Sequence, residues 1–484
     1  MRATKRALSL AVLGLLLALA AVTVHAQDAV APVPNPTGRD MFRLDDLESY
    51  RQFSRVKNFE IVGHSYFRGG WVVPGGRGTG INTLRICGTT AYLGGYNPTV
   101  FGALIVDVSD PTKMEPLAFI PGNPGTRNAY LRVDCAKKIL ALGHSTSPEN
   151  PNKAVGGPAR SGVTFHDVSE GRKPVKLAEY NNPGEYTHGM EMDDRHVYLC
   201  GTAEGSKPRA EELHIIDYSN PRAPRLAASF HVTGQRAGET FSPMNQKNPN
   251  GTDQWVTCHE AIKHGPRLYL AYRDAGLIIL DVTDPTKPGV VGEYDYVPPF
   301  NGDPGLPRPG CCPGAHTAAP VPQEGRPFPS LLVLTDEHFS CPPGFVRILD
   351  ITDPKAIQVL STIHIAGVDD RYDAATGTFV CPPGQQSSHL PYFEPRGHGS
   401  LFYQAWYDQG LRAFDISNPF SPKEVGYFIS PDTSIPTQVG RHTREAYVDP
   451  ATNLIYVTDG NGGGLTVLRY TGPMPQHPPI PGAR

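Results

Sequence analysis

The sequence lacks an excess of basic residues. Its 44 Lys and Arg are balanced by 47 Asp and Glu, which gives a formal net charge of −3 at pH 7. Proteins that bind nucleic acids concentrate positive charge on one face or along one segment. The charge balance therefore argues against DNA or RNA as a partner.

Long apolar runs are missing after residue 26, so the sequence predicts no membrane span in that part of the chain. The one long run extends from Ala7 to Val24. It follows a basic start and is followed by a cleavage-site pattern with a small final residue, Val24-His25-Ala26. These features are typical of a secretory signal peptide. We therefore expect residues 1–26 to be removed and the mature chain to be exported, either to the periplasm or outside the cell.

Several catalytic motifs are also absent. We find no Ser-centred nucleophile elbow, no phosphate-binding P-loop and no zincin motif. Glycine and proline are abundant instead, with 51 and 49 residues. This composition favours many short strands joined by turns, and no motif selects a reaction.

A repeated motif gives the strongest signal in the sequence. It is an apolar strand that ends in Asp and is followed by a Ser or Thr turn, usually with Pro. The six Asp residues are Asp107, Asp167, Asp217, Asp281, Asp350 and Asp415. Each is preceded by a hairpin and followed by another short strand, and four short antiparallel strands per repeat are typical of a propeller blade. We expect each Asp to cap its own turn.

A seventh unit, His442 to Tyr470, has no outer strand of its own. Residues 59–66 carry the outer-strand pattern, and a ring leaves exposed edges unless its ends pair. The sequence therefore predicts an all-β fold, a seven-bladed β-propeller over residues 56–471, in which residues 56–66 close the last blade.

The segments around the propeller are short. Residues 27–55 form an N-terminal extension, and Leu47, Tyr50, Phe53 and Val56 follow a spacing that indicates one short helix. Residues 472–484 form a Pro-rich C-terminal tail.

The clearest copies of the repeat are Ala103-Leu-Ile-Val-Asp107, Leu277-Ile-Ile-Leu-Asp281 and Val346-Arg-Ile-Leu-Asp350. They resemble the LVIVD-repeat family of exported prokaryotic β-propeller proteins, and the resemblance covers about residues 56–471. That family has no single assigned activity. The resemblance implies architecture and export only.

The eight cysteines are an even number, and export exposes them to an oxidising compartment, which favours disulfides. Cys87 and Cys135 end the first strands of adjacent blades, so we expect them to pair. We expect a second bond between Cys200 and Cys258. The remaining residues share two bonds whose partners stay open: Cys311, Cys312, Cys341 and Cys381.

One residue begins the innermost strand of each blade when the repeats are aligned. In chain order these residues are Asn82, Asn128, His188, His259, His316, His389 and His442. Innermost strands line the central channel of a propeller, so we expect these side chains to converge on its axis. Neutral imidazole is a common metal ligand, and a His-rich set suits Cu, Fe or Zn. We predict that at least three of the histidines bind one transition-metal ion, while the two asparagines bind water or substrate.

Other interpretations of the ring stay open. Repeats diverge from one ancestral unit, and a His at the start of each blade can simply hydrogen-bond a neighbouring backbone group. The ring can also serve as a ligand or substrate pocket without metal.

The loops predicted to be long all lie on the face where the innermost strands begin, and long loops on a rigid scaffold commonly carry function. They span residues 145–161, 233–258, 297–315, 367–388 and 431–441. The connections between second and third strands on this face also contain acidic and basic residues, Glu337 among them. From these we take as candidate catalytic residues Arg273, Asp274, Asp336, Tyr407 and Asp459. We expect a monomer that binds a small-molecule or glycan substrate at this face.

Three functions remain possible on the sequence alone. The favoured one is a transition-metal-dependent oxidoreductase. The alternative is a binding module for a glycan, peptide or protein partner with a structural His ring, and the third is metal storage or delivery.

Overall fold

The computed structural model describes residues 22–26 and 46–475, apart from internal gaps. The gaps are residues 68–79, 98–100, 124–125, 127–129, 147–160, 185, 208–209, 240–255, 296–313, 324–329, 340, 342, 367, 369–371, 376–377, 382–383 and 432–441. Cys311, Cys312 and Asn128 lie outside the described residues, as do most residues of the five long loops.

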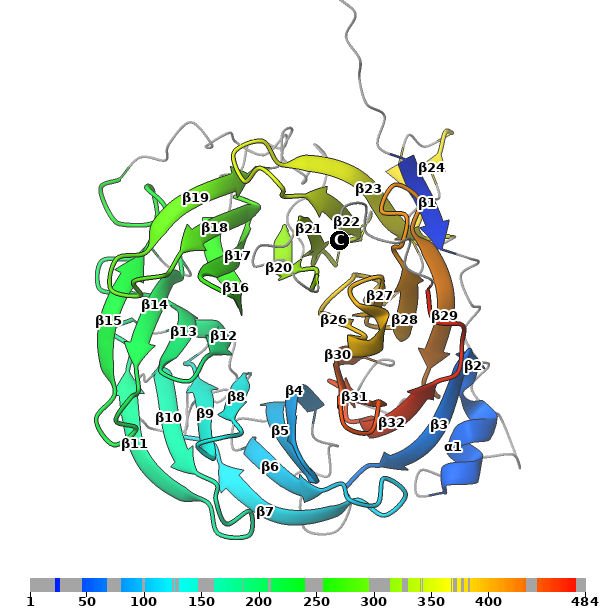
Figure 1. The fold of residues 1–484 in the computed structure, drawn as a ribbon, viewed down its shortest axis with the longest axis horizontal. Coiled ribbons are helices and arrows are strands. Elements are labelled where there is room, and N and C mark those ends of the chain that lie inside the picture. The colour runs from blue at the N-terminus through cyan, green and yellow to red at the C-terminus, as the bar shows by residue number, and fades with distance from the viewer. Residues whose placement is uncertain are drawn as a thin grey trace, which may run out of the picture.

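The chain folds into the predicted seven-bladed β-propeller, with antiparallel blades arranged around one axis (Figure 1). Blade one contains β4 (Gly80–Cys87), β5 (Thr90–Asn97), β6 (Phe101–Asp107) and β7 (Glu115–Pro121). Blade two contains β8 (Leu131–Asp134), β9 (Ile139–His144), β10 (Gly162–Asp167) and β11 (Val175–Asn181). Blade three contains β12 (Thr187–Met192), β13 (His196–Gly201), β14 (Glu212–Asp217) and β15 (Arg225–Phe230).

The next three blades follow the same order from the axis outward. Blade four contains β16 (Val256–His264), β17 (Arg267–Arg273), β18 (Leu277–Asp281) and β19 (Gly289–Tyr294). Blade five contains β20 (Ala315–Pro320), β21 (Leu331–Asp336), β22 (Val346–Asp350) and β23 (Gln358–Ile365). Blade six contains β26 (Pro391–Phe393), β27 (Leu401–Ala405), β28 (Leu411–Asp415) and β29 (Lys423–Ile429), with the short helix η1 (Pro395–Gly397) after β26.

Blade seven is built from both ends of the chain. It contains β30 (Thr443–Val448), β31 (Leu454–Asp459) and β32 (Gly464–Tyr470), and β3 (Phe59–Ser65) pairs with β32 as its outer strand. The predicted closure is therefore confirmed. The start of the predicted strand differs, because β2 (Arg55–Lys57) pairs with β29 of blade six instead. The N-terminal segment thus joins the last two blades.

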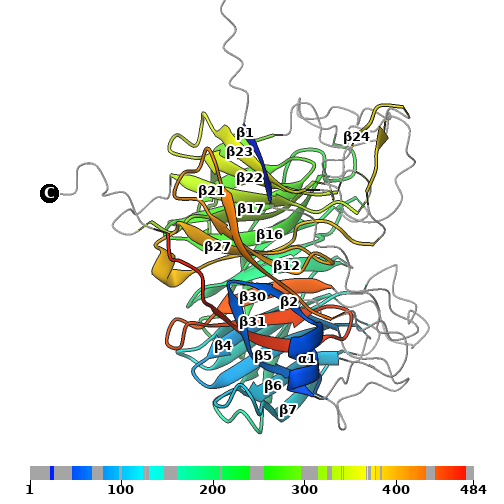
Figure 2. The same ribbon diagram turned by 90° about the vertical axis from the view of Figure 1, so that its right-hand side faces the viewer.

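A helix lies where the spacing predicts one. α1 (Leu47–Phe53) begins after Asp46, whose side chain accepts a hydrogen bond from the backbone of Glu48. It lies on the outer rim beside β2 (Figure 2). The ring of Tyr50 stacks on His64 of β3 at 3.7 Å between centroids, and its hydroxyl bonds Thr466 of β32 at 2.8 Å. The helix therefore fastens the closing strand to blade seven.

The remaining elements are small. β1 (Val22–Ala26) runs parallel to β23 and lies within the segment predicted to be removed. Blade five has four strands without it. β24 (Tyr372–Asp373) and β25 (Thr378–Phe379) form a short hairpin. Among the described residues, no helix is long and apolar enough to cross a membrane.

The apolar cores lie between adjacent blades rather than on the axis. Between blades three and four, for example, Leu213 and Ile215 pack with Leu268, Leu270 and Ile278. The turn after each third strand is capped as expected. In all six repeats the Asp side chain accepts a hydrogen bond, at 2.8 to 2.9 Å, from the backbone N–H two residues later. The repeat Asp residues are therefore structural.

Three disulfides cross-link the described part of the chain. The predicted Cys87–Cys135 and Cys200–Cys258 bonds are confirmed, and each joins two adjacent blades. The third links Cys341 to Cys381, which is a pairing that the sequence left open.

Candidate metal centre

Four of the predicted histidines form a continuous row on the propeller axis. The ring centroids of His188 and His259 lie 4.0 Å apart, those of His259 and His316 4.3 Å apart, and those of His316 and His389 4.1 Å apart. The four residues come from blades three to six. Side chains that are 57 to 73 positions apart in the sequence are thereby brought into direct contact.

Tyr407 separates the fifth histidine from this row. Its ring centroid lies 4.8 Å from that of His389 and 4.3 Å from that of His442, on which it stacks. The row therefore reads His188, His259, His316, His389, Tyr407 and His442.

Irregular strand pairing directs the ring residues toward the axis. The register shifts between Thr187 and Met190, which flank His188, and between Ala315 and Thr317, which flank His316. Bulges of this kind redirect side chains near functional sites. A third shift, between Val256 and Glu260, lets the consecutive residues His259 and Glu260 both contribute to one group of ligand atoms.

Glu337 completes the first group of potential ligands. Its Oε2 lies 4.0 Å from Nε2 of His259 and 3.8 Å from Nε2 of His316. The ligand atoms of these three residues all lie within 4.8 Å of one another, and all three side chains are buried. Two imidazoles and one carboxylate are thus available to one ion.

Two of the predicted catalytic residues hold Glu337. Arg273 donates a hydrogen bond from Nη2 to Oε2 over 2.9 Å, and the hydroxyl of Tyr407 donates to Oε1. Burial alone raises the pKa of Glu337, but Arg273, His389 and the Tyr407 hydrogen bond outweigh it and keep the pKa below its usual range. Glu337 is therefore an ionised carboxylate.

The backbone of these two residues is unusual. Arg273 has a φ of 46° and Tyr407 a φ of 31°, although neither is glycine. Left-handed backbone is uncommon for bulky residues and tends to occur at functional sites. Arg273 ends the second strand of blade four, and Tyr407 follows the second strand of blade six. The two blades flank blade five, which carries Glu337.

Glu260 forms a second group with His188 and His259, whose ligand atoms also lie within 4.8 Å of one another. Burial raises the pKa of Glu260 to about 8, against the opposing charge of Arg132 and a hydrogen bond with Tyr130. The row of histidines therefore carries one ionised carboxylate and one that burial tends to protonate.

Arg444 occupies the other half of the ring. Its carbonyl oxygen lies 2.6 Å from Nδ1 of His389, and its Nη1 donates to the Tyr407 hydroxyl over 3.2 Å. Its Nε donates to Nδ1 of His442 over 3.0 Å. Because Nδ1 of His442 accepts a hydrogen bond, the neutral ring carries its proton on Nε2. His442 thus presents no lone pair at Nε2.

Burial keeps the ring histidines neutral. It lowers the pKa of four of them well below the ordinary value, and nearby positive charge adds to the effect, from Arg273 at His259 and His316 and from Arg444 at His389 and His442. Neutral imidazole is the form that binds metal.

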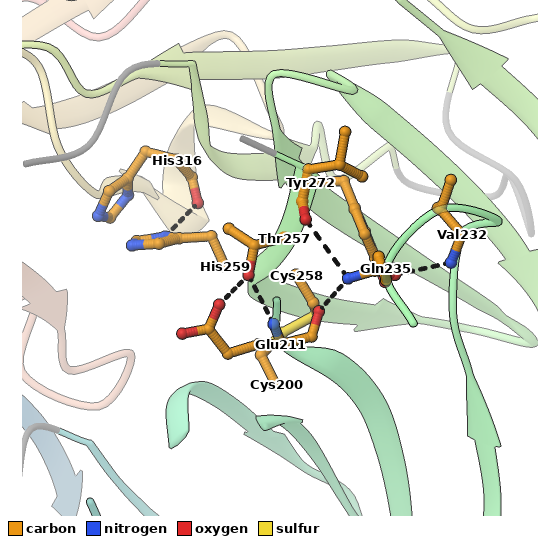
Figure 3. The surroundings of a disulfide bond; sticks show 10 residues. Cys200, Glu211, Val232, Gln235, Thr257, Cys258, His259, Tyr272 and His316 are labelled. Atoms are coloured by element: carbon orange, nitrogen blue, oxygen red, sulfur yellow. Dashed lines mark hydrogen bonds between the residues drawn. A yellow bond between two sulfur atoms is a disulfide. The ribbon is translucent and has the colours of Figure 1, made fainter. Parts of the chain in front are cut away.

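A disulfide fixes the strand that carries His259 (Figure 3). Cys258 precedes His259, and its bond to Cys200 ties blade four to blade three. The backbone N–H of Glu211 donates to the Thr257 hydroxyl over 2.8 Å, and Gln235 donates to the Glu211 carbonyl oxygen over 2.6 Å. The start of β16 is therefore tied to blade three by the disulfide and by the hydrogen bond at Thr257.

The structure also places the other predicted site residues. Asp336 binds Arg347 within blade five, so the acid that faces the ring is its neighbour Glu337. Asp459 accepts hydrogen bonds from the backbone of His442 and Gly463, which makes it a turn cap. Both were predicted as catalytic, and that role stays a prediction beside these contacts. Asp274 and Asn82 are buried.

The sequence analysis missed Glu260 as a site residue and passed over Glu337. Strict alternation along a strand sends neighbours to opposite sides, so a residue next to a ring His is not expected beside it. The bulge in β16 removes that restriction. For Glu337, the only indication in the sequence was that it follows Asp336 in a loop on the same face as the ring.

Comparisons with known proteins agree with the repeat and the fold. The LVIVD repeat model matches residues 209–232, 265–296 and 399–429. A protein from Lactobacillus plantarum superposes with a TM-score of 0.51 at 13% identity, covering 83% of this chain and 95% of that chain. A putative 6-phosphogluconolactonase from Bacteroides uniformis gives a TM-score of 0.49 at 13% identity, covering 76% and 87%. At these identities the likeness concerns the fold alone. No curated protein matches the sequence. The chain is a β-propeller protein that carries LVIVD repeats.

Proposed function

We propose that this chain is an exported transition-metal-dependent enzyme of the oxidoreductase class, with its metal held on the propeller axis by His259, His316 and Glu337. The observation that carries the proposal is the convergence of two buried neutral imidazoles and one ionised carboxylate, with ligand atoms within 4.8 Å of one another. Two histidines and one carboxylate with open positions are the donor set of non-haem iron oxygenases, and zinc enzymes use the same set.

The donor atoms fit a metal ion. Nε2 of His259 is buried and has no hydrogen-bond partner among the residues that the structure describes. Nδ1 of the same ring faces the His316 carbonyl oxygen at 3.2 Å, so a proton on Nδ1 leaves the Nε2 lone pair available. A bound ion would pair this buried atom.

The chain's own residues orient the site. Arg273 and Tyr407 fix the Glu337 carboxylate, and Tyr407 and Arg444 add polar groups beside the row of histidines. A bound metal would supply redox or Lewis-acid chemistry to a small-molecule or glycan substrate that enters from the face where the innermost strands begin.

Export rests on the predicted signal peptide and is supported by the three disulfides, because such bonds persist in oxidising compartments. Fractionation of cells that express the full chain, with sequencing of the mature N-terminus, tests this part. A cytoplasmic chain that keeps residue 1 would contradict it.

A binding module is the second candidate, and the Arg444 network favours it. His389 and His442 are engaged by Arg444 in the way that structural histidines are. If no metal binds, all five ring histidines are structural. The face where the innermost strands begin would then bind a glycan, peptide or protein partner.

Elemental analysis of the purified mature chain, before and after reconstitution, tests the proposed function. We expect at least one Fe, Cu or Zn ion per chain and oxygen- or redox-linked turnover of a substrate in the loaded form. Glu337→Gln should bind one ion fewer than the wild type. Glu445→Gln is the matched control, because Glu445 lies near the same axis but pairs with Arg85. A reconstituted wild type without stoichiometric metal overturns the proposal.

A further inference from the structure

A second set of donors lies beside the first on the same row of histidines. His188, His259 and Glu260 have ligand atoms within 4.8 Å of one another, and His188 and His259 are in ring contact at 4.0 Å. Glu260 is 1% exposed. Only His259 belongs to both sets.

Glu260 has an unsatisfied oxygen. Its Oε1 is buried and makes no hydrogen bond with any residue in the described part of the chain. A buried carboxylate oxygen without a partner is costly, and native structures rarely keep one without a function. A cation bound beside Glu260 would pair this oxygen.

The neighbouring strand makes room for this carboxylate. Gly189 follows His188, and a Cβ at that position would lie 2.8 Å from both Cδ and Oε2 of Glu260, and 2.0 Å from the His259 carbonyl oxygen. Any larger residue would displace Glu260 or separate β12 from β16. Glycine thus lets the two strands approach closely enough to place His188 beside Glu260.

We propose that the axial site binds a second transition-metal ion at His188 and Glu260, next to the ion of the proposed function on which this inference rests. The Nε2 lone pair of His259 binds one ion at a time. When the first ion holds His259, the second has one protein ligand fewer and needs water to complete its coordination. The second ion therefore binds more weakly, and the paired ions suit a substrate that binds through two oxygen atoms.

Titration of the chelator-stripped mature chain with Co²⁺ tests this inference. Equilibrium dialysis with elemental analysis gives the number of ions per chain, and calorimetry gives each Kd. We expect two Co²⁺ ions in the wild type, the second bound at least tenfold more weakly. Glu260→Gln and His188→Ala should each bind one ion, and Glu337→Gln should bind one at the remaining group. Glu191→Gln is the control and should bind two, because Glu191 lies near Arg132 and its side chain accepts a hydrogen bond from the backbone N–H of Met192.

Each outcome separates the two proposals. A wild type that binds a single ion, or a Glu260→Gln variant that still binds two, overturns the second position and leaves the proposed function intact. A wild type that binds none overturns both. Thermal melting of every variant shows whether it folds, and His188→Ala supplies an independent answer if Glu260→Gln does not.

Discussion

Nε of Arg444 lies 3.0 Å from Nδ1 of His442 and donates a hydrogen bond to it. This contact places the proton of neutral His442 on Nε2. Nδ1 of His259 instead faces the His316 carbonyl oxygen, which leaves the lone pair of His259 on Nε2. The ring that the sequence presents as five equivalent positions is therefore divided. One half offers lone pairs to an ion, and the other half is held by Arg444.

The first prediction follows from this division. His259→Ala should reduce the metal that survives dialysis to less than a tenth of the wild-type amount, because the tightly bound ion needs His259 and dialysis removes the weaker one. His442→Ala should leave the amount of bound metal unchanged within twofold. Elemental analysis after dialysis measures both. Equal loss of metal in the two variants would contradict the division of the ring.

The second prediction concerns Tyr407, which orients Glu337 without belonging to a ligand group. Tyr407→Phe removes the hydrogen bond to Oε1 of Glu337 and should weaken metal binding about 10- to 100-fold, as loss of outer-shell partners does. Calorimetry measures the Kd. Tyr403→Phe is the control, because Tyr403 donates to buried Glu394 in the same blade at 2.7 Å. If both variants bind metal as the wild type does, Tyr407 is not a positioning residue.

Much of the fold was predictable because it depends on periodic signals. The repeated Asp marks the end of each third strand, and its turn forms from local hydrogen bonds such as that between Asp107 and Ser109. The ring positions followed from aligning these repeats. The closing strand was predictable because blade seven lacked a partner for β32.

The carboxylates of the site could not be derived in the same way. Glu260 and Glu337 follow no repeat, and each reaches the axis through a local irregularity or a turn. The tautomer of His442 depends on Arg444, two residues further along the same chain segment, and no pattern in the sequence predicts that hydrogen bond. Position on a repeat is readable from a sequence, but the direction of a side chain at a bulge is not.

The third prediction is an acid sensitivity of the metal-free protein. His259, His316, His389 and His442 have folded-state pKa values well below 6.5, so below pH 6.5 the unfolded chain binds protons that the folded chain does not. The free energy of unfolding should then fall by about 1.4 kcal/mol per pH unit for each histidine. Glu260, with its pKa raised to about 8, acts in the opposite direction and offsets one of them.

Thermal melting in chelator between pH 7 and 5 measures this effect, in a window where few carboxylates of the unfolded chain are protonated. We expect the melting temperature to fall steadily over that range. His389→Asn should make the dependence of the free energy of unfolding on pH less steep, by the contribution of one proton. A melting temperature that stays constant from pH 7 to 5 would show that the ring is accessible to protons in the folded state.

The last prediction concerns ring closure. Deletion of residues 27–67 from the mature chain removes β3, whose buried Phe59 and Ile61 cover blade seven, and leaves β32 as an open edge. Burying one such side chain contributes about 1.5 to 3 kcal/mol, and an exposed apolar edge promotes association. We therefore expect aggregated protein. A chain that starts at Asp46 is the matched control, because it keeps the stacking of Tyr50 on His64 and the pairing of β3 with β32, and it should elute as a folded species. Size-exclusion chromatography with light scattering distinguishes the two, and a well-folded monomer from the longer deletion would show that the propeller closes without its N-terminal strand.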